Sequence, residues 1–74
     1  MNPSQLIAFL NAIGVGEMDG IRAKLERARE ACRALEQSEL ADKLTEAETA
    51  LTQADLRTYR KRLEAVVARL GHLR

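Results

Sequence analysis

Residues 14–20, with the sequence GVGEMDG, form the stretch whose residue types and spacing come closest to a recognised chemical motif. Glycines at this spacing let backbone N–H groups approach a phosphate at the start of a helix, as in dinucleotide-binding turns. Such a turn needs a parallel sheet to hold it, and no later segment has the pattern of a strand. Glu17 and Asp19 would also place carboxylates beside the phosphates. We therefore interpret this stretch as a helix end followed by a turn.

A basic cluster, Arg57, Arg60 and Lys61, is the second group of residues that could do chemistry. Several cations along one side of a helix are what a nucleic-acid backbone requires, so these residues are candidate phosphate contacts. Base stacking is not offered, because the neighbouring aromatic residue, Tyr59, falls on the apolar face of the same helix. We favour a structural explanation, in which the cluster faces an acidic helix. Nucleic-acid binding is the alternative hypothesis.

The remaining titratable residues form no pattern that predicts catalysis, a metal or a cofactor. Cys32, the single cysteine, lies on an apolar helix face, which favours a buried thiol over an intersubunit disulfide or a reactive thiol. His72 stands close to the C-terminal end without an acidic neighbour in the sequence. The carboxylates Asp42, Glu46 and Glu48 are not combined with His or Cys at metal-ligand spacing. We expect a protein without enzymatic activity, metal or cofactor.

Size and composition favour a protein that associates with other chains. The 74 residues are expected to form a single small helical domain over 1–74. A chain of this length buries only about 60% of its unfolded surface, so its core is marginal. There is no Trp, the only other aromatic residue beside Tyr59 is Phe9, and the apolar residues are mainly Leu and Ala. We expect a homo-oligomer, a dimer as the first choice, or association with a larger protein.

Charge is distributed in blocks along the chain, although the net charge is only +1. Residues 21–35 sum to +3, residues 36–55 to −5 and residues 56–74 to +5. Blocks of opposite sign favour consecutive helices that lie side by side, and the small net charge indicates neither nucleic acid nor a membrane surface. No apolar run approaches the ~20 residues of a membrane span, and no leader pattern is visible, so we expect a cytoplasmic protein.

The first predicted helix covers residues 3–13. Asn2 is a good N-cap, Pro3 suits the first helical position, and Gln5 completes a capping box. Apolar residues cover well over half of this short helix, so we expect part of its surface to meet a second copy or a partner.

The rest of the chain is predicted to form helices over 17–36, 38–51 and 53–71, with 17–51 as one long helix in the alternative. The first of these is organised around an apolar seam spaced for packing against another helix. The seam consists of Met18, Ile21, Leu25, Ala28, Cys32 and Leu35. Thr52 and Asp55 have the spacing of a capping box before the last helix, and Gly71 is the expected end of that helix.

These patterns predict an all-α fold: a short N-terminal helix and an antiparallel helical hairpin or three-helix meander, completed as an oligomeric helical bundle. The predicted function is a non-enzymatic protein-interaction or assembly module that self-associates through apolar helix faces. The predicted interface consists of Leu6, Phe9, Leu10, Ile13, Ile21 and Leu25.

Overall fold

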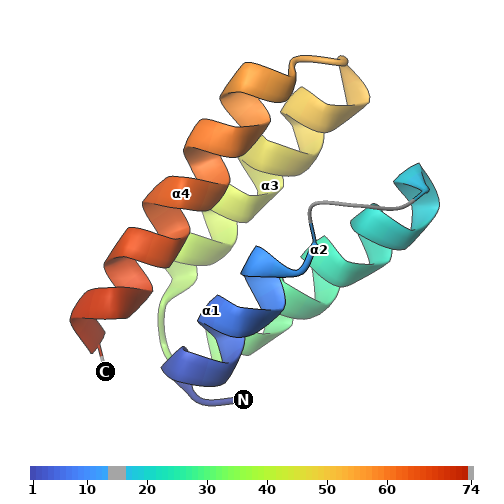
Figure 1. The fold of residues 1–74 in the computed structure, drawn as a ribbon. Coiled ribbons are helices and arrows are strands. Elements are labelled where there is room, and N and C mark those ends of the chain that lie inside the picture. Colours follow the sequence, from blue (N-terminus) through green and yellow to red (C-terminus); the bar gives the residue numbers. More distant parts are fainter. Residues whose placement is uncertain (14–16, 74) are drawn as a thin grey trace.

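Four helices form the protein in the computed structural model, which describes residues 1–13 and 17–73. The helices are α1 (Pro3–Asn11), α2 (Met18–Ala34), α3 (Ser38–Thr52) and α4 (Leu56–Leu73), and these residues contain no strand (Figure 1). The predicted all-α class and the short N-terminal helix before a three-helix meander are confirmed. The glycine turn predicted at Gly14 and Gly16 lies outside the described residues.

Consecutive helices run in opposite directions, which gives an up-and-down arrangement of four helices (Figure 1). The central helix α3 packs against both α2 and α4, and α1 packs against the same two helices from the other side. Within the described residues, the backbones of the two diagonal pairs, α1 with α3 and α2 with α4, lie farther apart than those of adjacent helices. Because α1 has 9 residues and α4 has 18, α1 covers only part of the channel between α2 and α4.

The start of α1 has the predicted capping box. The side-chain oxygen of Asn2 accepts a hydrogen bond of 2.7 Å from the backbone N–H of Gln5. In return, the backbone N–H of Asn2 donates to the Gln5 side chain at 3.0 Å. Two backbone donors that the helix leaves free are satisfied in this way.

The chain breaks between α2 and α3, so residues 17–51 do not form one long helix. Glu36 has a φ of 62°, in the left-handed region. The backbone N–H of Glu36 donates to the carbonyl of Arg33, and that of Gln37 donates to the carbonyl of Cys32. This pair of hydrogen bonds is the Schellman motif, which normally has glycine at the left-handed position.

The junction between α3 and α4 repeats the same motif, with Ala54 at a φ of 61°. The predicted cap is wrong here: α4 begins at Leu56, and Asp55 rather than Thr52 caps it. The hydroxyl and the backbone N–H of Thr58 donate to the Asp55 carboxylate and lower its pKa. Thr52 instead closes α3, and its hydroxyl donates to the carbonyl of Glu48.

We expect Ala54→Gly to stabilise the protein by about 1 kcal/mol, because a non-glycine residue in the left-handed region has a steric cost that glycine avoids. The matched control is Ala23→Gly, an exposed position inside α2, which should lose about 1 kcal/mol of stability instead. Thermal unfolding followed by circular dichroism measures both. A lower melting temperature for Ala54→Gly would show that the turn does not constrain this residue.

The core lies along α3, which contributes more buried residues than any other helix. Its members are Leu6, Leu10, Ile13, Leu25, Ala28, Cys32, Leu40, Ala41, Leu44, Ala47, Ala50, Leu51, Tyr59, Val66 and Leu70. The predicted seam of α2 is buried only in its middle, since Met18 is 47% exposed. The predicted end of the last helix is also wrong, because α4 continues past Gly71 to Leu73.

Ion pairs join the acidic helix to both basic neighbours, as the charge blocks predict. Arg29 of α2 pairs with Glu48 of α3 at 2.8 Å, and Arg22 approaches the same carboxylate at 4.0 Å. On the other side of α3, Arg62 of α4 pairs with Glu46 at 3.4 Å. Such pairs contribute little energy at a surface but favour this order of helices.

Candidate interaction groove

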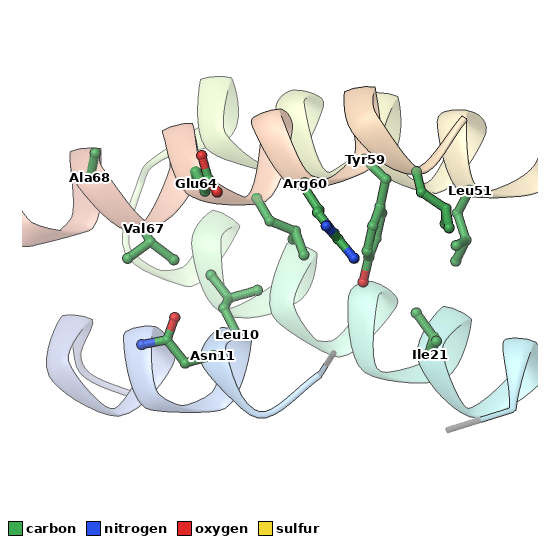
Figure 2. Close-up of a pocket in the computed structure, with 11 residues that line it drawn as sticks. Leu10, Asn11, Ile21, Leu51, Tyr59, Arg60, Glu64, Val67 and Ala68 are labelled. Carbon is green, nitrogen blue, oxygen red and sulfur yellow. The ribbon is translucent and has the colours of Figure 1, made fainter. Parts of the chain in front are cut away.

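An open groove continues the line of α1 beyond the last turn of that helix, between α2 and α4 (Figure 2). The groove has a volume of about 480 Å³. Its apolar lining comes from all four helices: Leu10, Ile21, Leu51, Leu56, Leu63, Val67 and Ala68. Its polar lining consists of Asn11, Tyr59, Arg60 and Glu64. Among the described residues, α1 ends before it fills the channel, which leaves the groove open.

Tyr59 forms part of the wall of this groove. Its side chain extends from α4 toward the helix that carries Ile21 (Figure 2). The residue is only 6% exposed, and its hydroxyl has no hydrogen-bond partner in the part of the chain that the structure describes. Burial raises the pKa of the Tyr59 phenol, because desolvation disfavours its charged form. Buried hydroxyl groups normally have a hydrogen-bond partner, and the described residues provide none for this one.

The groove-facing side of α4 carries a second stripe, which the sequence reasoning missed. It consists of Leu56, Arg60, Leu63 and Val67, spaced by four, three and four residues. We call these four residues the α4 stripe. The core side of the same helix uses a different set, Tyr59, Val66 and Leu70. Leu63 and Val67 are only partly buried and Leu56 is 54% exposed, so the stripe retains accessible apolar surface.

The signal for the α4 stripe is present in the sequence, although a charge obscures it. Arg60 occupies a position of the 4-3-4 spacing where an apolar residue is expected. Leu56 and Leu63 also fit a different spacing of three and four residues, together with Tyr59, Val66 and Leu70. Only the structure separates the residues that face the core from those that face the groove.

The predicted phosphate contacts Arg57, Arg60 and Lys61 are all exposed. Within residues 1–13 and 17–73, no carboxylate lies within ion-pair distance of any of them. The three do not form an uninterrupted basic surface, however. Arg60 lines the groove, and Glu64 follows it by one turn on the same side of α4.

Most of the predicted self-association interface is in the interior of the chain. Leu6, Leu10, Ile13 and Leu25 belong to the core, and none is more than 3% exposed. A folded second copy cannot reach buried side chains. Of the six predicted residues, Phe9 and Ile21 remain partly exposed, and Ile21 lines the groove. The available apolar surface is therefore the groove and the α4 stripe rather than α1.

The thiol of Cys32 is fully buried in the core, and desolvation raises its pKa. An intersubunit disulfide through Cys32 would require the core to open. His72 is exposed in the last turn of α4. The described residues hold no cluster of three or more histidine, cysteine or acidic side chains that could bind a metal ion. None of the helices seen here combines the length and the hydrophobicity needed to cross a bilayer.

Comparison of the chain with protein-family models, with curated proteins and with solved structures finds no match.

Proposed function

We propose that this chain is a non-enzymatic interaction module that self-associates through the groove between α2 and α4. The observation that carries the proposal is the mismatch in helix length: among the described residues, none covers the apolar groove beyond α1. In an up-and-down bundle the fourth helix normally covers the whole channel. A helix from a second copy would supply the missing cover and bury the exposed part of the α4 stripe.

Exposed large apolar side chains occur at both ends of the bundle, Met1 and Leu73 at one end and Met18 and Leu56 at the other, and of these four only Leu56 lines the groove. Met18 begins α2 and Leu56 begins α4, and the two helices start at the same end of the molecule (Figure 1). They are 47% and 54% exposed. Burial of a large apolar side chain contributes about 1.5–3 kcal/mol, so half-exposed residues in both copies give a modest gain. We therefore expect weak association, with a dissociation constant no lower than the micromolar range.

A reducing, cytoplasmic compartment belongs to the same proposal, because the one thiol is free and buried. A helix of a larger protein would fit the groove by the same chemistry. Nucleic-acid binding through Arg57, Arg60 and Lys61 has less support, since Glu64 interrupts the basic surface and Tyr59 is buried.

Leu56→Ser should weaken self-association by at least about tenfold, because each dimer loses an exposed leucine from both copies. Leu73→Ser is the matched control: Leu73 is 44% exposed at the end of α4, and it does not line the groove. Sedimentation velocity over a range of concentrations measures the dissociation constants, and circular dichroism verifies that both variants are helical.

Self-association of Leu73→Ser is expected to equal that of the unaltered chain. Equal losses in the two variants would mean that the groove is not the interface. A wild-type chain that sediments as a monomer at every concentration would overturn the proposal itself, and a helix of another protein would then be the candidate occupant.

A further inference from the structure

The α4 stripe contains a charge at a position that the fold does not explain. Arg60 stands between Leu56 and Leu63 on the groove side of α4, and its side chain extends along the groove beside Tyr59 (Figure 2). Glu64 is one turn away, about 6 Å along the axis, yet the two residues form no ion pair. In the described part of the chain, neither has another partner of opposite charge.

We propose that a second copy of this chain docks on the α4 stripe with two-fold symmetry, its α4 antiparallel to the first, so that Arg60 of each copy pairs with Glu64 of the other. This inference rests on the proposed self-association and specifies its geometry. It gives both unpaired charges a partner and covers the apolar stripe in one contact.

The spacing of the stripe fits an antiparallel pair and not a parallel one. In an antiparallel two-fold contact centred between residues 61 and 62, Leu56 lies opposite Val67 of the second copy, and Arg60 lies opposite Leu63. Each layer then contains at least one aliphatic side chain, and no two arginines meet. A parallel pair in register would instead place Arg60 against Arg60, which is repulsive.

Arginine suits this position because its aliphatic stem can pack on a leucine while its guanidinium extends to the edge of the contact. Glu64 of the second copy follows the opposing Leu63 by one residue, so its carboxylate lies at that edge. Two-fold symmetry repeats the pair, which places two identical ion pairs on either side of the axis. The charges therefore determine the register, and the aliphatic residues supply most of the buried area.

The test uses two charge reversals in the full chain, Arg60→Glu and Glu64→Arg, alone and mixed. Each variant alone would place like charges opposite one another at both pairs, so we expect each to lose at least about tenfold in self-association. In an equimolar mixture, both cross-pairs have opposite charges again. The mixture should form heterodimers with nearly the wild-type affinity, which sedimentation velocity and native mass spectrometry detect.

Lys61→Glu is the control, because it makes the same charge reversal at an exposed neighbour that does not line the groove. It should associate like the wild-type chain. Its heterodimer with Glu64→Arg has one attractive and one repulsive pair, so that mixture should associate less tightly than the mixture of the two reversals. Reversal variants that associate normally, or a mixture no tighter than its components, would overturn the two-fold register while wild-type self-association remained. A monomeric wild-type chain would overturn the proposed function and this inference together.

Discussion

Replacing Leu44 with alanine is expected to lower the free energy of unfolding by about 3–4 kcal/mol. Leu44 lies in the middle of α3, the helix that packs against both α2 and α4, and its side chain is fully buried. The substitution removes apolar contacts in the core and leaves a cavity that rigid helices cannot fully close. For a domain of this size, the melting temperature should fall by about 15–25 °C.

Urea unfolding followed by circular dichroism measures this loss, at one fixed protein concentration so that association contributes equally to each variant. Leu73→Ala provides the control, because the same truncation at a 44% exposed position near the chain end should change stability by less than about 1 kcal/mol. Similar losses in the two variants would be inconsistent with a core centred on α3.

The helix class and the start of α1 could be predicted because their signals are local. Asn2, Pro3 and Gln5 specify a helix start without reference to any other part of the chain. The alternation of charge between helices also favours consecutive helices that lie side by side, and ion pairs join α3 to both α2 and α4. In both cases the sequence pattern and the tertiary contacts favour the same structure.

The helix ends are harder to predict from the sequence, because the turns lack the glycine that usually identifies a helix end. Schellman motifs are recognised from glycine, whereas this chain places Glu36 and Ala54 in the left-handed region. Such residues are held there by the packing of the helices on either side, which no local pattern reveals. Because neither glycine nor proline occurs at the turn between α2 and α3, the sequence is also compatible with one long helix over 17–51.

The groove could not be predicted because it depends on how far α1 reaches. Residues along α1 are apolar on most sides, and this pattern predicts that part of the apolar surface of α1 contacts a partner. In the structure, Leu6, Leu10 and Ile13 are instead buried in the core of the chain itself. The uncovered apolar surface lies where α1 ends, and it belongs mainly to α4.

Replacing Ala47 with leucine is expected to destabilise the protein by about 2–3 kcal/mol, for the opposite reason to Leu44→Ala. Ala47 is fully buried one turn after Leu44 on α3. Helix α3 packs against both α2 and α4, so a larger side chain at this position has no exposed surface through which to extend. A leucine adds the bulk of an isopropyl group, which forces the helices apart or the side chain into a strained rotamer. Urea unfolding measures the loss, and Ala23→Leu at an exposed position of α2 should stay within about 0.5 kcal/mol of wild type. A neutral Ala47→Leu would show that the centre of the bundle has space to fill, and that its small residues do not bring the helices together.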